Sequence, residues 1–554
     1  MKKMFLLTLC LLFSLNAMAL IDMKDANYVE TWTDLDMGGP GYILKVERTY
    51  NSRSIYDGVF GFGWCSDFET RLEITPDSKI KVIECGGGLE ITYAVKDSET
   101  GSVADLVKKI VSKVKQDKKD AGLKEQYFVN LEKELSTNEF LRDALASELG
   151  FKGKITKGTT YFASGRGSER LIVSDSSYKR ILADGTYQNF DVKGRLIALY
   201  DNSKNFIKLN YVNDRLVSVI DNQSRRLDFS YNTSNSKVAK IVSSPSKQTI
   251  SYSYKAHDLA AVLNSKSLNY QYKYDDLHNM TEATYPDKTT KKFVYNQDKD
   301  WVVSFTDQQR CSETYQYKDS EDDPRNHYWS EVKKTCSGKV TNESKYEFWH
   351  KEKDNKAGKY LSRVKSVVNG ILTDVKYHPD FGRPIFKQEG REMAFYDYYT
   401  NGLLKIRKTE EERYKYFYKN ACNKVSKIVQ ETLLKRKVAS TLTTSYLYYT
   451  PACSLKVAAN TKGESALLSY DKEGRIYMVT DQTKKIIKIT YDKMSGKPNI
   501  LTRPGLGAIA VKYNDQGEIS SVKSQQGAAV ATQVANVFNN ILRVIGPAAN
   551  DISI

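Results

Sequence analysis

The chain has 554 residues, with 84 Lys and Arg against 67 Asp and Glu, which gives a formal net charge of +17. Hydrophobic residues make up 40% of it, and Tyr (38) is much commoner than Phe (20) or Trp (5). This composition excludes a disordered or collagen-like chain and favours half-buried sheet surfaces, where Tyr packs well. The one long apolar run is at the very start, which excludes a polytopic membrane protein.

The N-terminus is typical of a secretory signal peptide. Lys2 and Lys3 precede the apolar run 4–15, and Ala17-Met18-Ala19 supplies a cleavage site of small residues. An uncleaved anchor is the alternative, but the run is too short to span a bilayer. The sequence therefore predicts that residues 1–19 are removed and that the mature chain is exported to the periplasm, the cell surface or the medium.

Export makes the cysteines informative. Six remain when Cys10 of the leader is set aside, and an even number in an oxidising compartment predicts three disulfides among 15 formal pairings. Because the six fall into three sequence-local pairs, we predict Cys65–Cys85, Cys311–Cys336 and Cys422–Cys453. Zinc ligation would need clustered Cys or His, and no such spacing occurs, so we expect no metal.

Residues 20–97 are predicted to be a β region containing two short motifs. The first comprises Arg48, Tyr50, Asn51, Ser52 and Arg53, and the second comprises Gly61, Gly63 and Trp64. The glycines lie between aromatic residues, which indicates tight turns in an exported β region and not a nucleotide site.

Residues 98–150 are predicted to be a helical insert, followed by a return of the N-terminal β region over 151–177. Apolar residues recur with helical spacing from Val103 to Val114. Ser136 and Glu139 are expected to form a capping box before a second apolar face, with Gly150 as the stop. We expect this insert to cover an open end of the sheet, with partner docking as the alternative.

A repeat occupies residues 178–526. A Tyr, or a near substitute, closes a short alternating run and is followed by a polar turn, mostly at intervals of 20 to 23 residues. The positions are Phe190, Tyr211, Tyr231, Tyr254, Tyr274, Tyr295, Tyr317, Trp349, Tyr377, Tyr398, Tyr418, Tyr449, Tyr470, Tyr491 and Tyr513. This period, with strands and no helix between them, predicts one hairpin per repeat.

Each repeat carries the residues of a hairpin turn. Clear copies have Asp after the aromatic residue, as in Asp191, Asp275, Asp471 and Asp492, and some have Gly three residues later, as in Gly194 and Gly474. Gly supplies the positive φ that closes the turn, and Asp bonds the backbone ahead of it. An isolated hairpin is unstable in water, so about fifteen in a row must pair into one long antiparallel sheet that curls.

These units resemble the YD repeats of the Rhs family. The stretch 182–295 is similar to the first repeats of such proteins, and the two motifs around Arg48 and Trp64 are similar to the motif that opens their N-terminal region. The resemblance covers roughly residues 42–95 and 160–526. It implies a spiral β-sheet shell, with the N-terminal region and the C-terminal tail covering its exposed edges.

Many Rhs proteins end in a self-cleavage motif followed by a toxin. The segment most similar to this self-cleavage motif is Arg503-Pro504-Gly505-Leu506-Gly507, which lacks the family's Asp and precedes the last repeat. The stretch 527–554 is too short for a catalytic toxin, so self-cleavage and toxin delivery are not expected. Instead, apolar residues from Val530 to Ile545 predict an amphipathic helix that packs on the protein's own sheet or N-terminal region, with a membrane or partner role as alternatives.

No catalytic constellation is found in the sequence. The five histidines are scattered, and hydrolase serine motifs and phosphate loops are missing. We therefore name no catalytic or cofactor-binding residue and expect no cofactor. The positive charge favours anionic cell-envelope surfaces, but lysines spread over the chain serve solubility equally well, and nucleic-acid binding is not expected.

Three functional classes remain. The first is a secreted, non-enzymatic YD-repeat shell that binds a protein or glycan or encloses a cargo. The second is an accessory or truncated member of a contact-dependent Rhs toxin system, and the third is a carbohydrate-active envelope enzyme. We favour the first, as a mainly β protein with a small helical insert and a C-terminal helix.

Overall fold

The computed structural model describes residues 20–85, 88–95, 99–117, 122–264, 266, 268–353, 358–418, 423–450, 452–493, 495–513, 519–524, 527 and 544–546. The predicted signal peptide, Cys422 and most of the predicted tail helix lie outside these ranges.

One antiparallel sheet of 36 strands, β7 to β42, dominates the molecule. Each strand pairs with its neighbours in chain order, and within the described ranges β42 does not pair with β7, so the sheet is open. Its first half comprises β7 (Arg71–Ile74), β8 (Ile80–Glu84), β9 (Leu89–Ala94), β10 (Thr160–Ala163), β11 (Arg170–Val173), β12 (Ser177–Ile181), β13 (Tyr187–Asp191), β14 (Leu196–Tyr200), β15 (Phe206–Val212), β16 (Arg215–Asp221), β17 (Arg226–Tyr231), β18 (Val238–Ser244), β19 (Thr249–Lys255), β20 (Asp258–Leu263), β21 (Asn269–Tyr274), β22 (Met280–Thr284), β23 (Thr290–Tyr295) and β24 (Val302–Thr306). Its second half comprises β25 (Ser312–Asp319), β26 (His327–Cys336), β27 (Lys339–Glu352), β28 (Lys359–Val368), β29 (Ile371–Tyr377), β30 (Pro384–Glu389), β31 (Glu392–Tyr398), β32 (Leu404–Lys408), β33 (Glu412–Phe417), β34 (Lys427–Leu434), β35 (Lys437–Tyr448), β36 (Leu455–Asn460), β37 (Ser465–Tyr470), β38 (Ile476–Asp481), β39 (Ile486–Tyr491), β40 (Pro498–Arg503), β41 (Gly507–Tyr513) and β42 (Ile519–Ser524). The predicted fold class, a long antiparallel sheet of hairpins, is confirmed.

The repeated Tyr has a specific structural role. In most repeats its hydroxyl donates to the backbone carbonyl of the residue about 15 positions earlier, as Tyr274 does to Leu259 (2.9 Å) and Tyr470 to Leu455 (2.9 Å). The same residue follows a β-bulge in both hairpins. Most repeats are therefore bonded to their predecessor as well as paired with it, which explains why the period is kept.

Two positions of the predicted series are displaced from the bulge by one residue. In β27 the bulge precedes His350 and not Trp349. The second displacement is in β35. Tyr448, and not Tyr449, follows the bulge and donates to the Val425 carbonyl (2.9 Å), while Tyr449 donates forward to Leu468 (3.2 Å). The prediction was off by one residue because two adjacent tyrosines fit the pattern equally well.

The turn after the Tyr is built by the Asp. Oδ1 of Asp471 accepts from the backbone N–H groups of Glu473 (3.1 Å) and Arg475 (2.8 Å), and Gly474 has a φ of +83°. The Arg475 guanidinium then bonds Asp471 and lies 4.4 Å from the ring centroid of Tyr491 in the next repeat. Asp191, Arg195 and Tyr211 repeat this arrangement near the start of the array.

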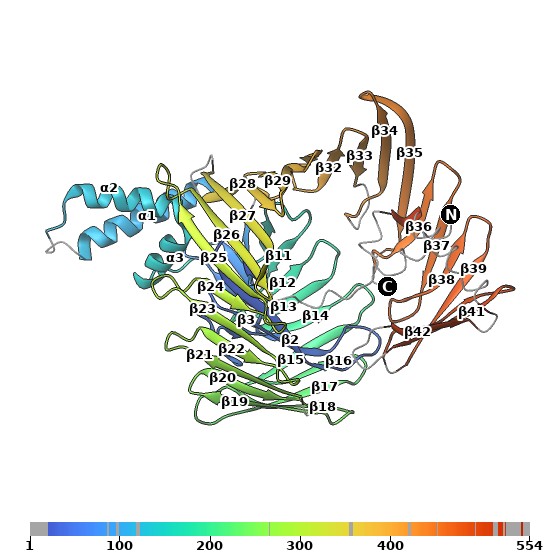
Figure 1. Ribbon diagram of the computed structural model, residues 1–554, viewed down its shortest axis with the longest axis horizontal. Coiled ribbons are helices and arrows are strands. Elements are labelled where there is room, and N and C mark those ends of the chain that lie inside the picture. The colour runs from blue at the N-terminus through green and yellow to red at the C-terminus, as the bar shows by residue number, and fades with distance from the viewer. Residues whose placement is uncertain are drawn as a thin grey trace.

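The sheet curls so that later hairpin tips meet earlier ones (Figure 1). The Gly167 N–H donates to the Asn401 carbonyl (2.9 Å), and the Asn205 amide donates to the Glu473 carbonyl (2.9 Å). At the start of the sheet, the Leu72 N–H donates to the Gly194 carbonyl (2.7 Å). These contacts join segments more than 100 residues apart and define the spiral.

A small sheet from the N-terminal region lies inside the curl, drawn in blue in Figure 1. It comprises β1 (Leu20–Asp22), β2 (Asn27–Asp36), β3 (Lys45–Asn51) and β6 (Trp64–Cys65), beside the pair β4 (Asp57–Gly58) and β5 (Gly61–Phe62). Its buried side chains form one core cluster with the inner face of the repeat strands up to β26. The N-terminal sheet thus fills the first part of the curl.

Three helices form the insert: α1 (Glu99–Asp117), α2 (Glu125–Thr137) and α3 (Glu139–Glu148). They bury a core of their own that includes the predicted face from Val103 to Val114, and α1 and α2 extend away from the sheet (Figure 1). The predicted capping box is wrong. Asn138 caps α3 by accepting from the Leu141 N–H (3.1 Å), while Ser136 lies in α2 and donates to the Glu132 carbonyl (2.7 Å).

Two of the three predicted disulfides are present. Cys65–Cys85 and Cys311–Cys336 are bonded, with Cα atoms 5.5 and 4.3 Å apart. Cys453 is also disulfide-bonded, but its predicted partner Cys422 lies outside the described residues. Of the predicted tail helix, Val544 and Ile545 are described, and both are buried in a second core cluster with strands β34 to β39.

Candidate functional site

The motif residue Arg48 is the centre of a buried network between the two sheets. Its guanidinium donates to both carboxylate oxygens of Asp34 (2.5 and 2.8 Å) and lies 4.7 Å from the ring centroid of Trp64. Tyr252 of β19 donates to the same carboxylate (2.8 Å), and burial raises the pKa of this phenol so that it remains a donor. A charge-assisted, fully buried network of this kind is costly to disturb.

A second buried ion pair lies nearby. Glu30 on β2 accepts from Lys291 Nζ on β23 at 2.8 and 2.9 Å, and from the Tyr285 hydroxyl at 2.7 Å. The side chains of the pair are only 7% and 11% exposed. The two partners are 261 residues apart in the sequence.

Other motif residues also hold the N-terminal sheet against the repeats. Tyr50 accepts from the Met280 N–H (2.8 Å), and Trp64 donates to the Tyr274 hydroxyl (2.9 Å). Ser52 accepts from the Tyr28 N–H (2.9 Å), Asn51 accepts from the Arg53 N–H (2.9 Å), and Arg53 donates to the Lys299 carbonyl (2.9 Å). Tyr50, Trp64 and Arg53 thus bond to the repeats, whereas the bonds of Ser52 and Asn51 stay within the N-terminal region.

The glycine-rich turn of the second motif fits against a repeat. Gly61 has a φ of +112°, and a Cβ there would lie 2.7 Å from the His257 carbonyl. The neighbouring Phe62 N–H donates to this carbonyl (3.0 Å). Close approach therefore requires glycine at this position.

Glu69 stabilises the same turn by hydrogen bonds. Its carboxylate accepts from the backbone N–H groups of Val59 (2.8 Å) and Ser66 (3.0 Å) and from the Tyr56 hydroxyl (3.2 Å). Burial raises the pKa of Glu69 above its ordinary value of 4.5.

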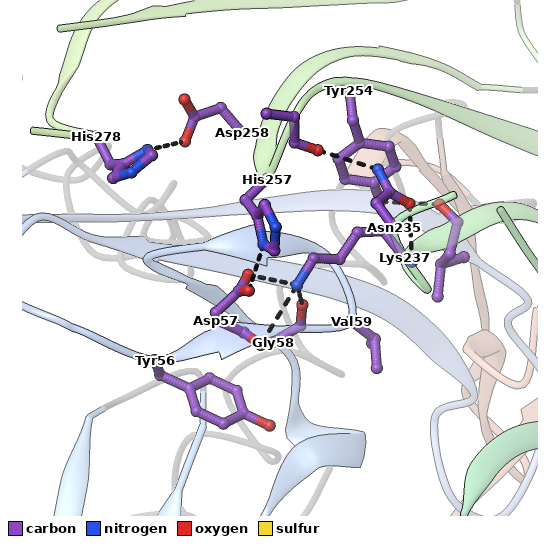
Figure 2. Close-up of polar contacts among 12 residues, drawn as sticks. Tyr56, Asp57, Gly58, Val59, Asn235, Lys237, Tyr254, His257, Asp258 and His278 are labelled. Atoms are coloured by element: carbon purple, nitrogen blue, oxygen red, sulfur yellow. Dashed lines mark hydrogen bonds and ion pairs between the residues drawn. The ribbon is translucent and has the colours of Figure 1, made fainter. Parts of the chain in front are cut away.

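Figure 2 shows the polar contacts between turns of the repeats and the segment 56–59 of the N-terminal region. One carboxylate oxygen of Asp57 binds the Lys237 ammonium group, and the other lies 2.6 Å from His257 Nδ1. Lys237 also donates to the Gly58 carbonyl (2.8 Å). In the next repeat, His278 Nδ1 lies 2.8 Å from Asp258, and its ring packs on Phe62.

This cluster has the geometry of a clasp. The carboxylate of Asp57 is shared between the ammonium group of Lys237 and the imidazole of His257. Across the described ranges, no group of three His, Cys, Asp or Glu is placed to hold a metal ion. The cluster is best suited to fixing the N-terminal sheet in the curl.

The inner face of strands β28 to β33, which we call the inner wall, is the second candidate site. The first core cluster extends to Val332 and the second begins at Tyr414, so strands β28 to β32 contribute to neither. Strand register places Tyr396, Arg407 and Tyr414 side by side on the inner face, all half-buried. The Arg407 guanidinium lies 5.6 Å from the ring centroid of Tyr414, whose hydroxyl donates to Glu412 (3.2 Å). This wall offers aromatic surface and a cation to a ligand.

Sequence reasoning found the motif residues but missed their partners. Asp34, Glu30, Lys237, Lys291 and His257 carry no local pattern, because each acts across 14 to 261 residues of sequence. The inner wall was missed for the same reason, since it is defined by register across many strands.

Comparison with known families matches only part of the chain. Residues 20–93 match a family model described as a domain of unknown function, DUF6531. No curated protein sequence matches the chain. No helix in the described part of the chain is long and apolar enough to cross a membrane.

Several solved structures are similar at low identity. "Crystal Structure of TcdB2-TccC3-TEV" is 12% identical with a TM-score of 0.37, and the match covers 62% of this chain and 19% of that one. "Crystal Structure of TcdB2-TccC3" is 7% identical with a TM-score of 0.24, covering 90% and 37%. A Photorhabdus luminescens Tc holotoxin pore is 11% identical with a TM-score of 0.26, covering 67% and 26%. The chain thus spans between a fifth and two fifths of the length of these structures.

Proposed function

We propose that this protein is an exported, non-enzymatic YD-type shell that works as a binding or encapsulating scaffold, with the inner wall of β28–β33 as its contact surface. The observation that carries the proposal is the interrupted core. The N-terminal sheet fills the curl as far as β26, and the inner faces of β28 to β33 are mostly half-exposed and include several Tyr side chains. The disulfides Cys65–Cys85 and Cys311–Cys336 are compatible with export to an oxidising compartment.

A polypeptide segment is the ligand that this wall suits best. Half-buried Tyr and Arg side chains are the types enriched at protein interfaces, because they combine apolar area with hydrogen-bonding ends. Tyr396, Arg407 and Tyr414 provide such a surface, and Gln430, which pairs with Tyr414 across the next strand, continues the row. The Gln430 side chain donates to Glu412 (3.1 Å).

Site-specific photo-crosslinking in the exporting cell tests the proposal. A benzophenone amino acid replaces Tyr414 on the inner face or, as the matched control, the next residue Lys415, which pairs with Glu431 on the outer face. The proposal predicts a discrete polypeptide adduct from position 414, identified by mass spectrometry, that is lost in the additional variant Arg407→Ala and is not formed from position 415. No adduct, or the same adduct from both positions, would contradict it.

A further inference from the structure

The core of the repeat sheet is divided between two bodies. The N-terminal body comprises the N-terminal sheet and the repeat strands as far as β26, which share the first core cluster. The C-terminal body comprises β34 to β42, whose strands β34 to β39 contribute to the second cluster. In the fully described stretch 359–417 between them, only Asp374, Ala394 and Gly402 are buried. Strands β28 to β33 therefore join the bodies by their backbone ladder, without a hydrophobic core that would fix their curvature.

The two bodies meet again where the curl closes. Figure 1 shows the C-terminal body, in orange to red, beside the N-terminal body and connected to it through β28 to β33. Among the described residues, one hydrogen bond joins the bodies at the closure, from the Asn205 side-chain amide to the Glu473 carbonyl (2.9 Å). Beside it backbone meets backbone, since a Cβ on Gly496 would lie 2.3 Å from the carbonyl carbon of Gly39. We call these four residues the latch. Contacts of this kind bury little apolar surface, so they hold the closure weakly compared with a core.

The N-terminal half of the latch is held in place by its own body. Asn205 is 2% exposed, donates to the Asp201 carboxylate (2.6 Å) and accepts from the Asn222 amide (3.1 Å). The Arg225 guanidinium donates to two carbonyls of the loop 38–42, at 3.0 and 2.7 Å. These bonds do not involve the C-terminal body. The N-terminal half of the latch therefore keeps its shape when the C-terminal body moves away.

A second contact holds the connecting strands at one rim. The Gly167 N–H donates to the Asn401 carbonyl (2.9 Å), and a Cβ on Gly402 would lie 2.4 Å from the Gly165 Cα. Asn401 and Gly402 belong to the turn between β31 and β32, not to the C-terminal body. This contact can therefore persist while the latch opens, and it gives a rotation of the C-terminal body a fixed pivot.

We propose that the C-terminal body is a gate that swings about strands β28 to β33, releases the latch and opens the inner wall to its ligand. The swing breaks the few polar and glycine contacts of the latch and leaves both core clusters intact. The closed and open states therefore differ by a small free energy, which a ligand that prefers one of them can shift. The control of the inner wall rests on the proposed function, whereas the swing is a property of the chain alone.

Double electron–electron resonance measures the swing without a ligand. Nitroxide labels are attached to ketone-bearing amino acids, so that the disulfides stay intact. They replace the exposed Lys208 on β15 and Lys488 on β39, one on each body, or Lys208 and Lys292, both on the N-terminal body. We expect a shorter and a longer distance for the first pair and a single distance for the second.

Two matched pairs of variants test the latch. Asn205→Ala removes its hydrogen bond, whereas Asn202→Ala removes a bond from the same turn to the Asp184 carbonyl (2.8 Å), within the N-terminal body. The ratio of longer to shorter distances should rise about fivefold in Asn205→Ala, as loss of one hydrogen bond predicts, and stay unchanged in Asn202→Ala. If Asn205→Ala does not fold, Gly496→Ala forces the latch apart by its Cβ, and Gly463→Ala, with a φ of +81° and nothing within 4 Å, is its control.

A disulfide across the closure tests control of the inner wall. A Cβ on Gly474 would lie 2.8 Å from the Ser203 Cβ, so the turn needs to move by about 1 Å for S203C/G474C to reach the usual separation of about 3.8 Å. The bonded protein should lose the longer distance and reduce the crosslink from position 414 at least about tenfold. The two single Cys variants, which cannot form the bond, should keep the crosslink.

Three outcomes would overturn the proposal: one distance between positions 208 and 488 in the natural chain and in both latch variants, equal shifts in Asn205→Ala and Asn202→Ala, or an undiminished crosslink in the bonded protein. The proposed function fails separately. If the natural chain forms no crosslink while Asn205→Ala alone increases the longer distance, the inner wall is not the contact surface and the swing is confirmed.

Discussion

Replacing Lys291 with Met breaks the buried ion pair between the repeat sheet and the N-terminal sheet. Lys291 Nζ lies 2.8 and 2.9 Å from the two oxygens of Glu30. Removing one partner of a buried pair typically costs about 3–5 kcal/mol, because the other charge is left without compensation. The hydroxyl of Tyr285 still donates to Glu30, and Met fills most of the space of the lysine stem. We therefore expect the free energy of unfolding to fall by about 3 kcal/mol, the lower end of that range.

The neighbouring residue provides a matched control. Lys292 carries the same side chain on the outer face of the same strand, is 61% exposed, and lies 3.7 Å from Glu282. Lys292→Met should cost less than about 1 kcal/mol, as exposed pairs do. Urea unfolding followed by the fluorescence of the buried Trp32 and Trp64 measures both variants. The double variant Glu30→Gln/Lys291→Met should recover part of the loss, and equal stability of the two Met variants would refute the reasoning.

Four further predictions follow from local geometry. Gly194→Ala should cost more than about 2 kcal/mol, because a Cβ would lie 2.1 Å from the Leu72 carbonyl, whereas Gly338→Ala, with a similar φ of +76° and open surroundings, should cost about 1 kcal/mol; equal melting temperatures would contradict this. Tyr470→Phe should cost about 1 kcal/mol by loss of its bond to Leu455, while Tyr477→Phe, on a side chain 43% exposed, should leave the denaturation midpoint unchanged. Because burial raises the pKa of Glu69 above 4.5, the folded chain holds this proton more tightly than the unfolded chain, and Glu69 alone lowers the free energy of unfolding as pH rises from 4.5 through the raised pKa. Melting curves recorded from pH 4.5 upward should show the melting temperature of Glu69→Gln rising relative to that of the natural chain as pH increases. A difference in melting temperature that does not depend on pH would contradict a raised pKa for Glu69. Deleting residues 528–554 removes the buried Val544 and Ile545 and should lower the melting temperature and increase binding of a hydrophobic dye; an unchanged melting curve would show that the tail is not part of the core.

The repeat array could be predicted because its signals are local. Tyr470, Asp471 and Gly474 act within one hairpin, so their spacing alone indicates a strand, a turn and a bulge. The helical face from Val103 to Val114 was predicted for the same reason. Errors occurred where two local solutions compete, as between Tyr448 and Tyr449 or between Ser136 and Asn138, because tertiary packing decides which of them is used.

The candidate sites could not be predicted in full, because the curvature of the repeat sheet brings together residues that are far apart in the sequence. The motif residue Arg48 was singled out, but its contacts with Tyr252 and Tyr272 depend on how far the sheet bends around the N-terminal strands. Lys291 and Lys292 have the same side chain and adjacent positions, yet one is buried against Glu30 and the other faces outward. Strand alternation distinguishes the two faces, but the partner across the interior is set only by the complete fold.

Zero-length carbodiimide cross-linking of the intact protein tests most directly whether the repeat sheet wraps the N-terminal sheet. The account predicts an isopeptide between Lys237 and Asp57, which are 180 residues apart and form an ion pair at the clasp. The exposed pair Lys193 and Asp214 at neighbouring turns serves as the internal control for reactivity. Peptide mapping should find both links in the natural chain and lose only the first in Lys237→Gln. Recovery of the Lys193–Asp214 link without any Lys237–Asp57 link would contradict the account.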